Sequence, residues 1–89
     1  MDMKYKEIEA KLFELIDMLK TCFTQAEIDE VIEFIEFNEY GLALDTVIDI
    51  IIEEDKRINN DILNMMIKLS SIMNLDSESL NKKMIAYIL

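Results

Sequence analysis

The 89-residue chain contains no His, Pro or Trp, and it has a single Gly and a single Cys. Because β-hairpins depend on Gly, Pro and similar turn residues, this composition argues against an all-β fold. No histidine can serve as a catalytic base, and one cysteine cannot form a Cys/His zinc site. The composition therefore disfavours most enzymatic and metal-binding schemes, and we expect no cofactor.

Long apolar runs are also missing, so no segment of the sequence is predicted to span a bilayer. Residues 1–13 mix charged and apolar side chains, unlike the apolar stretch of a signal peptide. Cys22 has no second cysteine with which to form an internal disulfide, as is usual in a reducing compartment. We therefore expect a cytoplasmic protein that does not associate with membranes.

Helical spacing of apolar residues runs along the whole chain. A first helix is expected over residues 3–20. Thr24 and Glu27 have the spacing of a capping box, which predicts that a second helix begins at residue 25. This helix is expected to extend to residue 37, where Asn38 can stop it in the left-handed conformation.

A third helix is expected over residues 40–54. Its apolar side chains cover most of its circumference, which predicts a position in the middle of the bundle. Residues 55–59 are expected to form a loop, and Asn59 or Asn60 to cap a fourth helix that ends near Asn74.

Asp76 or Ser77 is expected to cap a fifth helix. The sequence thus predicts an all-α fold, a single-domain bundle of four to five antiparallel helices over residues 1–89. The expected core consists of one apolar stripe from each helix: Tyr5, Ile8, Leu12, Leu15, Ile16, Leu19, Ile28, Val31, Ile32, Ile35, Leu44, Val47, Ile48, Ile51, Ile52, Ile62, Met66, Leu69, Met73, Leu80, Met84 and Ile88.

The net charge of −10 is concentrated in residues 21–54, which carry ten acidic side chains and no Lys or Arg. Because binding to phosphates needs Lys and Arg, such a chain is not expected to bind DNA or RNA. The acidic segment is either a solvated face that maintains solubility or a surface that attracts a basic protein.

Acidic residues recur on one side of each helix of this segment, and two aromatic residues lie at the corner between the helices. There Gly41 and Ala43 are expected to permit a close approach of the two helices, and Tyr40 to anchor the turn. Aromatic side chains beside charged ones are common at interface hot spots. The candidate partner-binding residues are therefore Glu30, Glu33, Glu36, Phe37, Tyr40, Asp45, Asp49 and Glu53.

Residues 39–45 read Glu-Tyr-Gly-Leu-Ala-Leu-Asp, after a Glu-rich helix and before an Ile-rich acidic one and the Met-Asn-Leu-Asp of residues 73–76. Over residues 25–76 this pattern resembles the MafI-type family of small bacterial immunity proteins, which neutralise toxin domains of polymorphic and contact-dependent growth inhibition systems. The resemblance implies stoichiometric binding that occludes a cognate toxin C-terminal domain. Many such toxins are nucleases, whose clefts are basic.

Two other classes of function suit a small acidic helical chain. A secretion chaperone or adaptor binds an extended segment of its client and often dimerises, whereas an immunity protein binds a folded domain. An enzyme is the third class, which the missing residue types disfavour. The sequence-based hypothesis is a monomeric immunity protein with a basic protein partner, and with no nucleic acid, membrane or cofactor bound.

Overall fold

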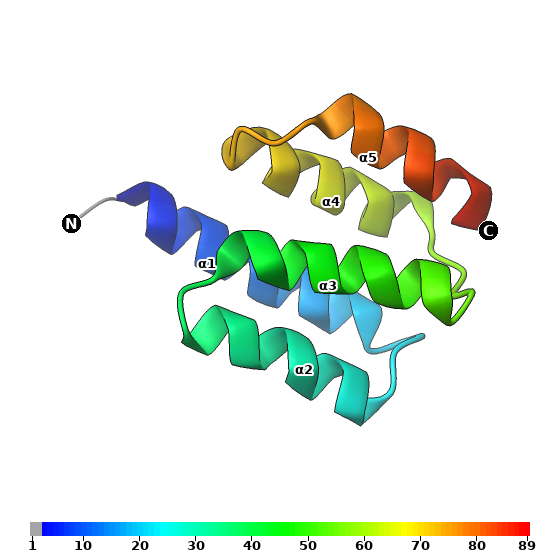
Figure 1. Ribbon diagram of the computed structural model, residues 1–89, viewed down its shortest axis with the longest axis horizontal. Helices are drawn as coiled ribbons and strands as arrows, with labels where there is room; N and C mark the ends of the chain where they lie inside the picture. The colour runs from blue at the N-terminus through cyan, green and yellow to red at the C-terminus, as the bar shows by residue number, and fades with distance from the viewer. Residues whose placement is uncertain (1–2) are drawn as a thin grey trace.

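The computed structural model describes residues 3–89, with only the backbone of Met3. It consists of α1 (Met3–Leu19), α2 (Gln25–Glu36), α3 (Tyr40–Glu53), α4 (Asn60–Ile72), α5 (Ser77–Met84) and a short 3-10 helix, η1 (Ile85–Tyr87). No strand occurs among these residues, so the predicted all-α fold of five helices is confirmed (Figure 1). The predicted ends of the first four helices lie within two residues of the observed ones, whereas the fifth helix, expected to reach Ile88, ends at Met84.

Consecutive helices run antiparallel, and two pairs of neighbours lie side by side, α2 with α3 and α4 with α5 (Figure 1). α1 contacts α2, α3 and α4, so the central helix is α1 and not the third helix. α3 packs mainly on α1 and α2, so one of its sides stays in solvent. Leu42 and Ile52 on that side are 48% and 39% exposed.

One hydrophobic core joins the five helices, and most of its residues come from the predicted stripes. Tyr5 and Ile52 were expected in the core, but both are exposed. Phe23 and Ile58 are buried although both lie in loops. Four further residues predicted as core are only partly buried: Ile32, Ile48, Met73 and Ile88.

Side-chain caps and left-handed residues set the helix ends. Thr24 and Glu27 form the predicted capping box at the start of α2. Asn59 and Asp76 each accept a hydrogen bond from the backbone N–H three residues later, at the starts of α4 and α5. Among residues 3–89 the positive φ angles occur just after α2, α3 and α4, at Asn38 (60°), Asp55 (51°) and Asn74 (59°).

The loop after α3 is tied to the end of the chain by a C-terminal clasp, formed by residues 57–58 and 86–89. The Ile58 N–H donates to the Tyr87 carbonyl and the Leu89 N–H donates to the Ile58 carbonyl, both at 2.9 Å. The Arg57 guanidinium donates to the Ala86 carbonyl at 3.1 Å and lies 5.8 Å from the Tyr87 ring centre. The clasp fully buries Ile58.

The molecule is flat, with dimensions of 38 × 28 × 18 Å and a radius of gyration of 12.0 Å. A compact chain of this length is expected to have a radius of gyration of about 12 Å. None of the helices described over residues 3–89 is both long enough and apolar enough to cross a bilayer.

Candidate partner-binding surface

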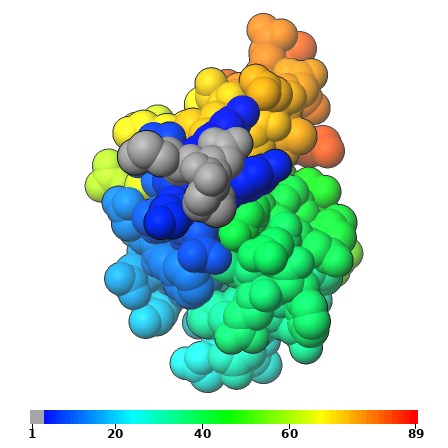
Figure 2. Space-filling model, turned by 90° about the vertical axis from the view of Figure 1, so that its left-hand side faces the viewer, coloured from blue at the N-terminus to red at the C-terminus, as the bar shows by residue number. Residues whose placement is uncertain are grey.

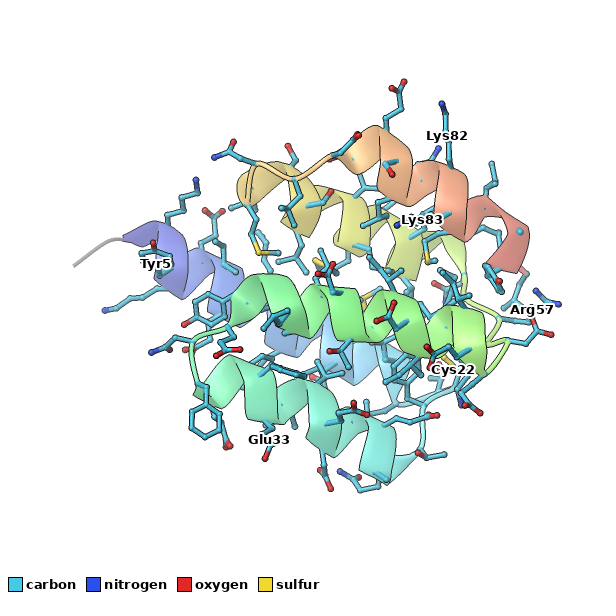
Figure 3. The ribbon with its side chains drawn as sticks, in the orientation of Figure 1. Tyr5, Cys22, Glu33, Arg57, Lys82 and Lys83 are labelled. Atoms are coloured by element: carbon cyan, nitrogen blue, oxygen red, sulfur yellow. The ribbon has the colours of Figure 1, made fainter. Side chains whose placement is uncertain are left out.

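The outer side of α2 is acidic because its buried residues leave the other positions in water. Ile28, Val31 and Ile35 face the core. The opposite positions line a shallow hollow together with Ala26 and Ile32, and the acidic residues there are Asp29, Glu30, Glu33 and Glu36. Figure 3 shows Glu33 projecting away from the other helices. The structure therefore brings together the three glutamates that the sequence predicted for this helix.

A second acidic hollow, here named the acidic groove, lies between α2 and α3 and has a volume of about 290 Å³. Because the helices are antiparallel, the first turns of α2 lie beside the last turns of α3. Thr46 and Ile50 contribute to the lining. The carboxylates that line the groove are Glu27, Glu30, Asp49, Glu53 and Glu54. Glu30, Asp49 and Glu53 were predicted from the sequence, whereas Glu27 and Glu54 were not.

One cation lies at the edge of the acidic groove. Lys56, in the loop after α3, pairs with Glu27 at 2.9 Å and lies 5.6 Å from the centre of the Phe23 ring. Thr24 donates its backbone N–H to Glu27, and this bond, aided by the Lys56 ammonium, lowers the pKa of Glu27 below its ordinary value. Within residues 3–89 the other four carboxylates of the groove form no salt bridge. Their charge is available to a partner.

Asp45 lies one helical turn before Asp49 and is exposed, but it does not line the acidic groove. Asp45, Asp49 and Glu53 are all exposed, as their spacing of four residues along α3 predicts. The acidic line therefore runs from the groove toward the start of α3.

Phe37 and Tyr40 lie at the corner between α2 and α3, away from the acidic groove. At about 1.5 Å per residue along α3, Tyr40 lies roughly 9 Å from Thr46, where the lining of the groove begins, and roughly 20 Å from Glu53 at its far end. Phe37 is 71% exposed, whereas Tyr40 is partly buried. The structure therefore does not unite these two aromatic residues with the groove carboxylates in one compact site.

Tyr40 holds the corner against α1, as expected for an anchor of the turn. Its hydroxyl proton is shared between Glu9 (3.2 Å) and Asn38 (3.1 Å), and its ring centre lies 6.3 Å from that of Tyr5. Burial and the neighbouring Glu9 carboxylate raise the pKa of Tyr40. Gly41 was expected to permit a close approach of α2 and α3. This prediction is wrong, because a Cβ placed at Gly41 would meet no atom within 4 Å.

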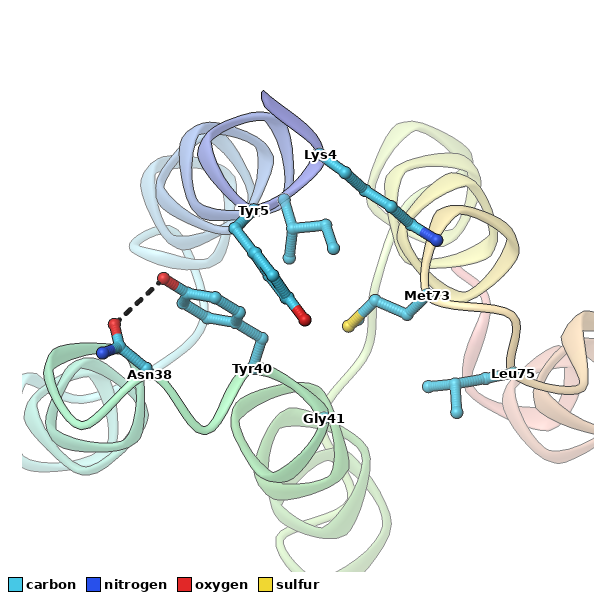
Figure 4. A pocket seen from close by; sticks show the side chains of 8 residues that line it. Lys4, Tyr5, Asn38, Tyr40, Gly41, Met73 and Leu75 are labelled. Carbon is cyan, nitrogen blue, oxygen red and sulfur yellow. Dashed lines mark hydrogen bonds between the residues drawn. The ribbon is translucent and has the colours of Figure 1, made fainter. Parts of the chain in front are cut away.

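Two adjoining hollows, here named the end hollows, lie beside Tyr40. Figure 4 shows the smaller one. Their volumes are about 370 and 570 Å³. The smaller is lined by Lys4, Tyr5, Ile8, Asn38, Tyr40, Gly41, Met73 and Leu75, and the larger by Tyr5, Lys6, Glu9, Asn38 and Tyr40. Sequence reasoning missed them because it assigned Tyr5 and Met73 to the core; their places at helix ends were the available signal.

Cys22 is partly buried in the turn between α1 and α2 (Figure 3). Burial is the main cause that raises the pKa of its thiol, and the Glu27 charge makes a smaller contribution. The sequence predicted that acidic neighbours would disfavour the thiolate. The direction of the pKa shift is correct, but its larger cause is burial.

No cluster of three His, Cys, Asp or Glu residues within residues 3–89 has the geometry to hold a metal ion. The buried side-chain polar atoms of this region all have hydrogen-bond partners.

The resemblance of residues 25–76 to immunity proteins stays a prediction. Comparisons of the chain with protein-family models, curated proteins and solved structures find no match.

Proposed function

We propose that this protein is an immunity protein, similar to the MafI type, that binds and neutralises a basic toxin domain through the α2–α3 hairpin. The observation that carries the proposal is the acidic groove, where five carboxylates face one hollow and Lys56 is the cation at its edge. Like charges on adjacent turns repel one another by a few tenths of a kcal/mol per pair. A basic partner would relieve that repulsion on binding.

The mechanism is occlusion. Lys and Arg side chains of the toxin enter the acidic groove and lie along the glutamates of α2. If the toxin is a nuclease, those side chains belong to the surface that holds its phosphate substrate, and the bound inhibitor excludes that substrate. The negative field also speeds encounter with a basic domain.

The lining of the groove supports an immunity function over that of a secretion chaperone. A chaperone that holds an extended client segment needs an apolar surface for alternate side chains. The groove instead presents mainly carboxylates, with Thr46 and Ile50 as its remaining lining residues. Such a lining suits basic side chains on a folded domain.

Charge reversal on the hairpin tests the proposal. We expect Asp49→Lys and Glu33→Lys each to weaken binding of the cognate toxin domain by more than about 1 kcal/mol. Both side chains are exposed, so the thermal unfolding temperature should change little. Binding is measured by calorimetry, and protection by growth of cells that co-express the toxin.

Glu7→Lys and Glu78→Lys are the matched controls, because both residues are exposed and lie outside the acidic segment. Both controls should retain protection. Loss of protection in the controls, with protection intact in the two hairpin variants, would contradict binding through α2 and α3.

A further inference from the structure

The end of the molecule opposite the acidic groove carries exposed apolar side chains around the end hollows. There the start of α1, the α2–α3 corner and the α4–α5 corner meet on one face (Figure 2). Phe37 is 71% exposed, Tyr5 53%, Leu42 48% and Leu75 44%. The proposed toxin contact with the acidic groove and the α2 glutamates does not use these four apolar side chains, although Glu36 borders both surfaces.

An exposed aromatic residue lies next to the end hollows in the chain. Phe37 immediately precedes Asn38, which lines both hollows. The larger hollow has the rings of Tyr5 and Tyr40 in its lining, and its volume of about 570 Å³ is within the range of pockets that enclose a ligand group. A face with both a projecting aromatic residue and an aromatic-lined hollow can bind a second copy of itself.

Opposite charges also lie around this face, and the Glu9 carboxylate of the larger hollow is already occupied by the Tyr40 hydroxyl. Lys6 lines the larger hollow, and Glu36 and Glu39 flank Phe37 in the sequence. All three side chains are exposed, and within residues 3–89 none of them forms a salt bridge. In a two-fold contact, each pair formed by a residue of one copy and a residue of the other is repeated with the two copies exchanged. Insertion of Phe37 then places two glutamates near the Lys6 of the other copy, on both sides of the axis.

We propose that this end is a self-association surface, on which two copies meet around a two-fold axis and the Phe37 of each enters the larger end hollow of the other. The molecule measures 28 × 18 Å across this end, so the contact would bury on the order of 800–1,000 Å² in total, the size of a weak interface. The acidic groove lies at the far end and stays open in both copies. The result is a weak, concentration-dependent dimer, in place of the monomer that the sequence suggested.

Sedimentation equilibrium tests the proposal directly. At about 0.15 M salt, which screens the like net charges beyond about 8 Å, the mass of 10.5 kDa should rise toward twice that value. Phe37→Ala should weaken association at least tenfold without changing the thermal unfolding temperature. Phe13→Ala is the matched control, because Phe13 is 42% exposed and lies about two turns after Tyr5 along α1, outside the proposed contact. The Phe13→Ala variant should dimerise normally.

Charge exchange tests the orientation of the two copies. Lys6→Glu should weaken the dimer, and so should Glu36→Lys combined with Glu39→Lys. All three changes in one chain should restore association. A wild-type chain that stays monomeric up to about 1 mM would overturn the proposal, as would a dimer that tolerates Phe37→Ala. A chain that stays monomeric but loses toxin protection with Phe37→Ala would assign this face to the toxin, which also overturns self-association.

Discussion

Glu27 joins two elements through a single carboxylate. It accepts the backbone N–H of Thr24 at 2.8 Å, which completes the capping box of α2, and it pairs with Lys56 from the loop after α3 at 2.9 Å. Its side chain is 18% exposed, so this pair is better shielded from solvent than an ordinary surface ion pair. Glu27 thus serves the fold more than the partner, although it lines the acidic groove.

The depressed pKa of Glu27 has a pH-dependent consequence. Because the folded state favours the ionised carboxylate, its contribution to stability is complete above the ordinary Glu range and is lost as pH falls through the lower native pKa. We expect Glu27→Gln to reduce the free energy of unfolding by about 0.5–1 kcal/mol at pH 7 and by much less at pH 3. Urea denaturation at both pH values measures this. An equal loss at both would show that charge plays no part.

Local signals explain why the helix boundaries could be predicted. Thr24, Asn59 and Asp76 each satisfy a backbone N–H three residues ahead, and Asn38 takes a left-handed conformation. These contacts lie within four residues of one another in sequence, so a reader of the sequence can find them.

Residues buried by distant partners could not be predicted in the same way. Ile58 lies in a loop, and its burial depends on η1 and the residues after it. Tyr5 has the spacing of a core residue, but it lies at the end of α1, beyond most of the bundle, and stays 53% exposed. Periodicity assigns a residue to a side of a helix, but it does not show where the neighbouring helices end.

The same distinction applies to the candidate surface. The short corner at Asn38 correctly indicated that α2 and α3 are antiparallel, which brings Glu30 beside Asp49 and Glu53. It did not show that the length of α3 separates this groove from Phe37. The pairing of α2 with α3 could be predicted from the sequence. That the acidic groove and Phe37 lie on different parts of the surface required the structure.

The C-terminal clasp should be a major source of stability for the α3–α4 loop. We expect Ile58→Ala to lower the free energy of unfolding by about 2–4 kcal/mol, because Ile58 is fully buried and a cavity would remain. Ile52→Ala is the matched control; this isoleucine is 39% exposed, and its loss should cost less than about 1 kcal/mol. Chemical denaturation measures both. Similar costs for the two variants would indicate that the clasp is open in solution.

Charge is divided unevenly across the whole molecule. The α2–α3 hairpin is acidic, whereas residues 55–89 carry five basic and four acidic side chains. Lys82 and Lys83 lie on α5, across the bundle from Glu33 (Figure 3). The molecule therefore has an electric dipole, which turns its hairpin toward an approaching basic domain before contact.

This asymmetry predicts opposite effects of salt on binding and on folding. Raising the ionic strength from about 0.01 to 0.15 M shortens the screening length from about 30 to 8 Å. The association rate constant with the toxin should fall at least about tenfold, while the dissociation rate changes less. The unfolding temperature should rise slightly as repulsion within the hairpin is screened. Stopped-flow mixing and thermal denaturation measure the two effects. An association rate constant that does not vary with salt would make the acidic hairpin a solvated face only.

The packing of α1 on α4 also constrains the order in which a growing chain can fold. α2 and α3 are joined by a short corner, so their hairpin can form from neighbouring residues as they leave the ribosome. α1 must wait for α4, which is synthesised much later, and Ile58 must wait for residues 87–89. The acidic hairpin is thus complete while the apolar side of α1 still lacks α4. The residues of the proposed toxin-binding surface are therefore synthesised before α4, which completes the core.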